Sequence, residues 1–256
     1  MQYFGFDKPS FGFKTFGFGV LEWLPTELFS TGAQGAFYLP EPENLYQDAA
    51  MTVPVTANGD PVGAMMDLSG NGNSAIQTVS ASRPTYQTDG ILHWLEFNGV
   101  NSFLSHNYSE GNDLTTAVGI ERLGGTGIQG AVFATAPGTR LSSSIVANSV
   151  NPNWGAFAGG FQSSGFSVLN NASVLVNIGE PEIPRQKLYT NGGLSASLSG
   201  TPYPGDVSNR QRIGRESDTR FLDGKIFGVV MISGAMTSEN RSLLEAYLAG
   251  ITGVTL

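Results

Sequence analysis

Short runs of alternating apolar and polar residues recur from about residue 35 onward, separated by clusters of Gly, Asn, Asp and Pro. The run 91–97 is the clearest example: Leu95 and Phe97 share one face with His93, and the run stops at Asn98-Gly99. A period of two residues indicates a half-buried β-strand, and Asn-Gly favours a turn. Many short strands at this spacing predict a β-sandwich or a barrel.

A hairpin and a longer strand are predicted in the second half of the chain. Residues 187–190 run into Asn191-Gly192-Gly193, and Asn-Gly readily takes the positive φ angles of a tight hairpin turn. The apolar run 221–232 predicts a strand with a break at Asp223-Gly224. Residues 124–165 are rich in Gly, Ala and Ser, and they fit small-residue strands and long loops equally well.

One helix is predicted near the C-terminus. Thr237 or Ser238 can cap its first turn, and Gly250 suits its end. The apolar stripe that would face the protein consists of Leu243, Leu244, Tyr247 and Leu248.

Composition supports a β-rich protein. The 256 residues include 34 Gly and 13 Pro but only 13% charged residues, which disfavours a helical bundle. The absence of Cys excludes disulfides and thiol chemistry and suits assembly in a reducing cytosol. A formal charge of −8 disfavours a nucleic-acid partner. Without a long apolar run or a signal-peptide pattern, we expect neither membrane insertion nor general secretory export.

The first 24 residues have a composition of their own, with three Phe-Gly-Phe triplets. Each triplet places two rings on one side of an extended chain, and so much apolar area is unfavourable in water. Such a segment could form the first strand of the sandwich, dock on a neighbouring subunit or lie on a membrane surface. We take residues 1–34 as an anchoring arm and 35–256 as the folded domain. The rings assigned to anchoring are Phe4, Phe6, Phe11, Phe13, Phe16 and Phe18.

A series of turn motifs runs through residues 34–256. They include Leu45-Tyr46-Gln47-Asp48, Asp67-Leu68-Ser69-Gly70-Asn71-Gly72-Asn73, Arg83-Pro84-Thr85-Tyr86, Leu95-Glu96-Phe97-Asn98-Gly99 and Phe221-Leu222-Asp223-Gly224. Together these motifs resemble those of laminin-G-like, concanavalin-A-like sandwich domains in phage and prophage structural proteins. The resemblance implies an all-β, antiparallel jelly-roll β-sandwich with an extended N-terminal arm and one short C-terminal helix.

The same resemblance implies a function. It indicates a non-enzymatic bacteriophage virion structural protein, a capsid decoration or head-fibre protein on the virion surface, assembled in the host cytoplasm. The arm would bind other virion proteins (capsid or tail subunits), and we expect a homo-oligomer because a symmetric assembly buries exposed rings. The alternative is a tail-associated or free adhesin that binds host surface glycans.

Patterns typical of catalysis are weak. The Glu-x-Asp-x-Glu strand of the sandwich glucanases is missing, and the nearest carboxylates, in Glu180-Pro181-Glu182, lie in a predicted loop. Of the two histidines, we interpret His93 as structural and His106 as a surface residue. We therefore predict that the chain is not an enzyme.

Calcium is the cofactor that the resemblance raises, because some laminin-G-like domains hold Ca²⁺ at a loop rim. Asp67, Asn71 and Asn73 offer hard oxygen ligands within seven residues. The same Asn- and Gly-rich stretch also suits an ordinary tight turn, which is the preferred interpretation.

Two groups of residues are candidates for binding a ligand. Trp154, with Asn153 beside it, lies in a predicted loop where its ring could stack on a sugar, although sandwich cores use Trp as well. Arg212 and Arg215 belong to a cluster with Arg210 and Arg220. Local pairing with nearby acids explains this cluster, and contact with an acidic glycan or another subunit is the alternative.

Overall fold

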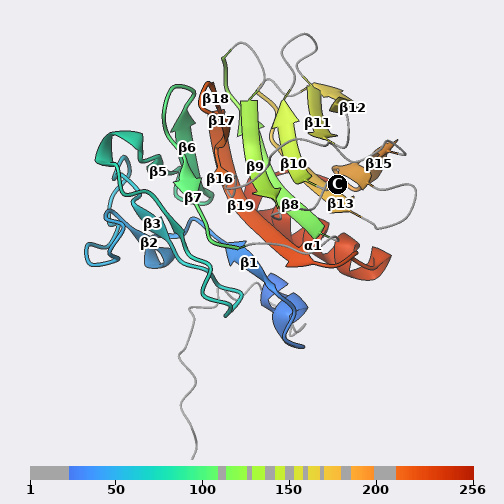
Figure 1. The fold of residues 1–256 in the computed structure, drawn as a ribbon, viewed down its shortest axis with the longest axis horizontal. Coiled ribbons are helices and arrows are strands. Elements are labelled where there is room, and N and C mark those ends of the chain that lie inside the picture. Colours follow the sequence, from blue (N-terminus) through green and yellow to red (C-terminus); the bar gives the residue numbers. More distant parts are fainter. Residues whose placement is uncertain are drawn as a thin grey trace, which may run out of the picture.

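Two antiparallel sheets form the body of the molecule (Figure 1). The computed structural model describes residues 23–108, 114–125, 129–135, 142–147, 153–157, 161–167, 170–179, 186–198 and 212–256. Most of these residues belong to strands, and one α-helix lies near the C-terminus. The prediction of an all-β sandwich with a short C-terminal helix is confirmed.

The first sheet, here sheet A, follows the order β15-β14-β13-β8-β19-β6-β5, with β1 also pairing with β19. Its strands are β1 (Gly35–Tyr38), β5 (Thr85–Thr88), β6 (His93–Asn98), β8 (Leu114–Arg122), β13 (Ser173–Gly179), β14 (Gln186–Thr190), β15 (Gly193–Leu198) and β19 (Asp223–Ser233). The predicted hairpin joins β14 to β15, and Asn191 and Gly192 have φ angles of 48° and 82°. The predicted break at Asp223-Gly224 is wrong, because β19 begins at Asp223 and the break falls at Leu222.

The second sheet, sheet B, follows the order β12-β11-β10-β9-β16-β7-β4-β3-β2. Its strands are β2 (Leu45–Tyr46), β3 (Ala64–Met65), β4 (Ala75–Ile76), β7 (Leu104–Ser105), β9 (Gln129–Thr135), β10 (Ser142–Ala147), β11 (Asn153–Phe157), β12 (Phe161–Ser167) and β16 (Arg212–Ile213). The described parts of 124–165 are therefore mainly strands. A separate hairpin pairs β17 (Arg215–Ser217) with β18 (Arg220–Phe221).

The core lies between the two sheets. Alternate residues of β6 point into it, as the period of two predicts. Leu95 and Phe97 of β6 are buried there, as expected, together with Leu104 and Ile213 from sheet B. The larger members of this core are Tyr38, Leu45, Met65, Leu95, Phe97, Leu104, Ile120, Ile145, Trp154 and Leu175.

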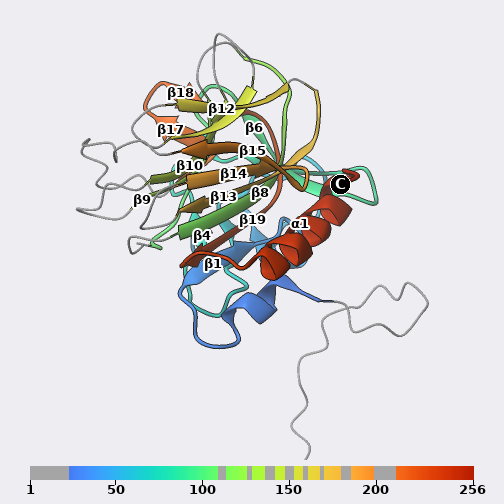
Figure 2. The same cartoon turned by 90° about the vertical axis from the view of Figure 1, so that its right-hand side faces the viewer.

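Helix α1 (Ser238–Thr252) covers part of the outer face of sheet A (Figure 2). The Thr237 side chain accepts a hydrogen bond from the Asn240 N–H, which confirms one of the two predicted caps. Leu244 and Leu248 are buried against the sheet, whereas Leu243 is exposed. The helix runs past Gly250 and ends at Gly253, which takes the left-handed conformation at φ 71°. The predicted stop was three residues early because both glycines suit a helix end.

Residues just before β1 also pack on the sandwich. The short helix η1 (Pro25–Phe29) buries Leu28 and Phe29 in the cluster beneath α1. The folded domain thus begins before residue 35, because these apolar side chains are covered by sheet A and α1. Phe4, Phe6, Phe11, Phe13, Phe16 and Phe18 lie outside the described residues, so their anchoring role stays a prediction. Among the described helices, α1 included, none is long and apolar enough to cross a bilayer.

Acidic side chains hold several connecting turns. Asp48 accepts hydrogen bonds from the N–H groups of Thr52 and Val53, at 2.9 and 2.8 Å. Asp60 and Asp89 accept pairs of backbone N–H groups in the same way. These bonds stabilise the charged carboxylates and lower the pKa values of Asp48, Asp60 and Asp89.

Acid should therefore weaken the fold through these turns. Because folding lowers the three pKa values from 3.8, their stabilising contribution is present above pH 3.8 and is lost as the pH falls through the folded values. Urea unfolding measured from neutral pH down to about pH 2.5 should show the free energy of unfolding falling at the acid end. Asp60→Asn should reduce that dependence, and Glu27→Gln, which removes an exposed carboxylate from η1, should not. Equal acid sensitivity in all three proteins would contradict this account.

Candidate functional site

Trp154 does not lie in a surface loop. It belongs to β11, and its side chain is 0% exposed within the core between the sheets. The loop prediction was wrong because the turn-favouring residues Asn151 and Pro152 come directly before a strand, β11, whose second residue points inward. Asn153 is half-buried at the start of the same strand. Trp154 is therefore a packing residue, and it cannot stack on a ligand at the surface.

Of the two histidines, one has the environment that the sequence predicted and the other does not. His93 is half-buried, and its Nδ1 lies 2.7 Å from the Tyr86 hydroxyl, which fits the predicted structural role. His106 is buried beside the ring of Tyr38, so its predicted surface position is wrong. The Glu180-Pro181-Glu182 segment lies outside the described residues.

Asp67 anchors a turn to β1. Its Oδ1 accepts hydrogen bonds from the N–H groups of Phe37 (3.0 Å) and Ser69 (2.9 Å). Its Oδ2 accepts from the Ser69 hydroxyl and the Asn73 N–H, both at 2.8 Å. The Asn71 and Asn73 side-chain amides donate to the Gly35 carbonyl, at 3.2 and 2.8 Å. The hydroxyl of buried Tyr38 donates a hydrogen bond to the Asn73 carbonyl. The burial of Tyr38 raises the pKa of this hydroxyl, and the nearby negative charge of Asp67 raises it further.

These contacts do not fit a calcium ion. Each oxygen of the Asp67 carboxylate, the one charged ligand of the predicted set, already accepts two hydrogen bonds. A cation would need those oxygens as its ligands. Within the described parts of the chain, no group of three or more His, Asp or Glu side chains could hold a metal. Residues 67–73 work as a hydrogen-bonded turn that ties sheet B to β1.

Arg212 and Arg215 come together on the outer face of sheet B. Ile213 between them is buried in the core, so strand alternation alone would place Arg215 inward. Gly214 interrupts that alternation with a φ angle of 84°, and its N–H donates to the Ala131 carbonyl at 2.7 Å. The turn at Gly214 thus brings Arg215 to the same side as Arg212.

Two phenylalanine rings complete this group. The Arg215 guanidinium carbon lies 4.6 Å from the centroid of the Phe103 ring and 5.0 Å from that of Phe221. Arg212 lies 5.8 Å from the Phe103 centroid. The two rings are half-buried and tilted, with centroids 6.3 Å apart. We call Phe103, Arg212, Arg215, Asp218 and Phe221 the arginine–phenylalanine cluster.

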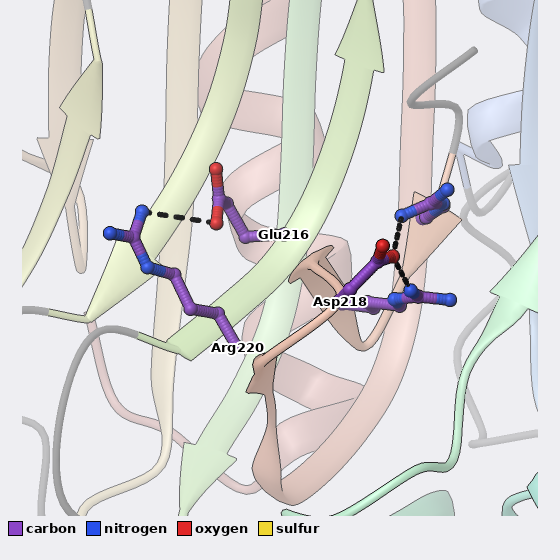
Figure 3. Close-up of polar contacts among 5 residues, drawn as sticks. Glu216, Asp218 and Arg220 are labelled. Carbon is purple, nitrogen blue, oxygen red and sulfur yellow. Dashed lines mark hydrogen bonds and ion pairs between the residues drawn. The ribbon is translucent and has the colours of Figure 1, made fainter.

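Asp218 faces both arginines from the tip of the β17–β18 hairpin (Figure 3). Its Oδ1 forms an ion pair with Arg215 and lies 3.9 Å from Nη1 of Arg212. The side chain of Asp218 is 88% exposed, whereas those of Arg212 and Arg215 are 21% and 13% exposed. Burial and the neighbouring Arg212 charge both lower the pKa of Arg215.

Arg220 belongs to a different pair. It contacts Glu216 at 3.1 Å on the other side of the hairpin (Figure 3). The backbone of Glu216 packs directly against Gly130 of β9. A Cβ atom added at Gly130 would lie only 2.2 Å from the Glu216 backbone nitrogen. Glycine at 130 therefore lets the hairpin approach sheet B. Arg210, the fourth arginine of the sequence cluster, lies outside the described residues.

Phe103 and Phe221 are members of the cluster that no pattern in the sequence had indicated. Each precedes a buried leucine, Leu104 or Leu222, so alternation places each ring on the outer face. Chemically, ring faces can stack on the C–H faces of a sugar. The guanidinium groups add several donors for hydroxyl or carboxylate oxygens.

Comparisons with known proteins show similarity in structure. No protein-family model and no curated protein sequence matches the chain. Trypanosoma rangeli sialidase in complex with the inhibitor DANA superposes with a TM-score of 0.56 at 14% identity, over 84% of this chain and 32% of that one. The same enzyme in complex with sialic acid gives 0.53 and 14%, over 89% and 34%. Domain 4 of AbnA, a GH43 extracellular arabinanase from Geobacillus stearothermophilus in complex with arabinotriose, gives 0.49 and 16%, over 82% and 98%.

These similarities correct the function expected from the sequence. The chain spans about a third of the length of the sialidases, which are carbohydrate-active enzymes. The prediction of a non-enzymatic phage virion structural protein is therefore wrong. It rested on turn motifs, which specify a sandwich and carry no information about where the sandwich is used. What the comparisons show is the fold, a β-sandwich that matches about a third of the sialidase chain.

Removing the Asp67 carboxylate should destabilise the protein. Asp67→Ala leaves the N–H groups of Phe37, Ser69 and Asn73 without their acceptor, and we expect a loss of about 2–3 kcal/mol in the free energy of unfolding. Asp67→Asn keeps one acceptor oxygen and should lose less. Denaturant unfolding measures both, and a wild-type value for Asp67→Ala would show that the turn does not depend on these bonds.

Gly214 should tolerate a side chain poorly. A Cβ there would lie 2.3 Å from the Phe97 ring, and its φ of 84° strains any L-residue, so Gly214→Ala should cost about 2–4 kcal/mol. Gly59→Ala is the matched control, because Gly59 has a φ of 88° with nothing within 4 Å of an added Cβ. Equal losses of unfolding free energy in the two variants would mean that packing on Phe97 contributes nothing.

Proposed function

We propose that this protein binds carbohydrate through the arginine–phenylalanine cluster on the outer face of sheet B. The observation that carries the proposal is the position of Arg215 beside two half-buried rings, 4.6 Å from the centroid of Phe103 and 5.0 Å from that of Phe221. Arg212 lies 5.8 Å from the centroid of the Phe103 ring and adds a second guanidinium group. Glycan sites combine an apolar platform with a few placed polar groups, and this cluster provides both.

The neighbouring strands extend the surface. Ser105 of β7 pairs with Arg212, and Ile76 of β4 pairs with Ser105, so these three residues form one cross-strand row. Leu104 and Ile213, one position along, are buried in the core, which places the row on the outer face. A bound chain of sugars could follow this row beyond the cluster.

The similar structures agree with a carbohydrate ligand. The Trypanosoma rangeli sialidase was solved with sialic acid, a sugar that carries a carboxylate. At 14% identity that likeness concerns the fold, so the ligand class is inferred from the residues of this chain. Arg212 and Arg215 supply the positive charge that a carboxylated sugar would meet.

Removing an aromatic face should weaken glycan binding. Phe103→Leu keeps an apolar side chain but loses the stacking surface, and we expect about a three- to tenfold loss of affinity. A glycan array screened with the wild type identifies the ligand, and titration calorimetry with that glycan compares the variants. Phe227→Leu is the matched control, because Phe227 is a buried phenylalanine that packs on Trp94 of sheet A.

Two results would contradict the proposal. One is a folded wild-type protein that binds no glycan on the array. The other is glycan binding that Phe103→Leu leaves unchanged, which would move the site away from the cluster. Thermal unfolding of each variant separates loss of binding from loss of fold.

A further inference from the structure

We infer that the cluster takes a carboxylated sugar, and that Asp218 occupies the place of the sugar carboxylate until the ligand displaces it. This inference rests on the proposed function and adds two elements to it: the acidic class of the ligand and an internal competitor for its binding position.

The first observation in favour of a carboxylate ligand is the geometry around Asp218. Both arginines are directed at the same atom, Oδ1 of Asp218. Guanidinium groups bind carboxylates best through two parallel hydrogen bonds, and here one carboxylate oxygen is shared between two such groups. A ligand carboxylate placed between Arg212 and Arg215 could give one oxygen to each.

The second observation is the difference in exposure between Asp218 and the two arginines. The two arginines are largely buried against the rings of Phe103 and Phe221, whereas the side chain of Asp218 is 88% exposed. The cationic part of the site is thus fixed by packing, and the anionic part lies at the solvent boundary. Because the Asp218 side chain is already at the solvent boundary, it can exchange its contact with the arginines for water, so a ligand can replace it at low cost.

The third observation is the position of Asp218 at the tip of the β17–β18 hairpin, where it can move away from the arginines. Asp218 and Thr219 form the exposed turn of the β17–β18 hairpin, which belongs to neither large sheet. Glu216, the other acid of the hairpin, is buried and pairs with Arg220. Displacing Asp218 therefore changes a turn and leaves the packing of Glu216 over β9 in place.

The charges around the site agree with an anionic ligand. Arg212 and Arg215 both face the carboxylate of Asp218. The two guanidinium groups repel each other, which contributes to the lowered pKa of Arg215. A ligand carboxylate in place of Asp218, with Asp218 turned to water, would meet the same two guanidinium groups while the sugar ring adds contacts of its own.

The experiment compares one glycan in two forms. The probes are an oligogalacturonate and its fully methyl-esterified form, which share the sugar backbone but differ in carboxylate charge. Titration calorimetry with the full chain should show that the wild type prefers the free acid. Asp218→Asn should raise affinity for the free acid about two- to fivefold and leave the ester unchanged. Arg215→Gln should lower affinity for the acid by at least tenfold.

Matched controls separate the effect of direct contact between the cluster and the ligand from the effect of the protein's overall charge. Glu27→Gln removes one exposed negative charge from η1, which lies away from the β17–β18 hairpin (Figures 1 and 2). Arg220→Gln removes one positive charge from the same hairpin without touching the cluster. Neither should change affinity for the acid as Asp218→Asn and Arg215→Gln do.

The outcomes distinguish this inference from the proposed function. Equal binding of acid and ester would overturn the acidic ligand class and leave glycan binding intact. Weaker binding of the acid by Asp218→Asn would overturn the competitor role and make Asp218 a positioning residue. Binding of neither probe, together with an array on which only uncharged glycans bind, would overturn the inference alone. An array with no bound glycan would overturn the proposed function as well.

Discussion

The whole structure depends on burying the inner faces of two sheets against each other. Leu95 and Phe97 from one sheet and Leu104 and Ile213 from the other point into the same core, and this alternation decides which residues point outward. The outer face of sheet A carries α1 and η1. Sheet B carries the β17–β18 hairpin instead, with cationic and aromatic side chains between hairpin and sheet. Because α1 covers the outer face of sheet A, the candidate site lies on the outer face of the other sheet, sheet B.

A second constraint is that the backbone of the many turns must find hydrogen-bond partners. Asp48, Asp60 and Asp67 provide them with their carboxylates, and the Asn98 side chain accepts from several N–H groups after β6. Asp48, Asp67 and Asn98 belong to the motifs that resemble laminin-G-like domains. Because their carboxylates and amides bond to the backbone of their own turns, the motifs report on the fold and not on a ligand or a host.

Local signals in the sequence were therefore good guides to local structure. The alternation in 91–97, the Asn191-Gly192 turn and the Thr237 cap are each determined by neighbours in the chain, and each is found in the structure. The cluster is different, because Phe103 and Arg215 meet through the register of strands that are far apart in sequence. Trp154 shows the same limit: its burial depends on the opposite sheet, which no pattern around residues 151–155 reveals. Function was harder still, since motifs shared by many sandwiches do not separate their uses.

The β17–β18 hairpin lies outside both large sheets and is attached through the turn at Gly214 and the break at Leu222. Its tip, Asp218-Thr219, is exposed and contributes no residue to the core. Such a separable element is a natural place for evolutionary variation, because substitutions at 218 and 219 are freed from the demands of folding. Related chains with the same core could then differ in the residues that this hairpin places beside Arg212 and Arg215.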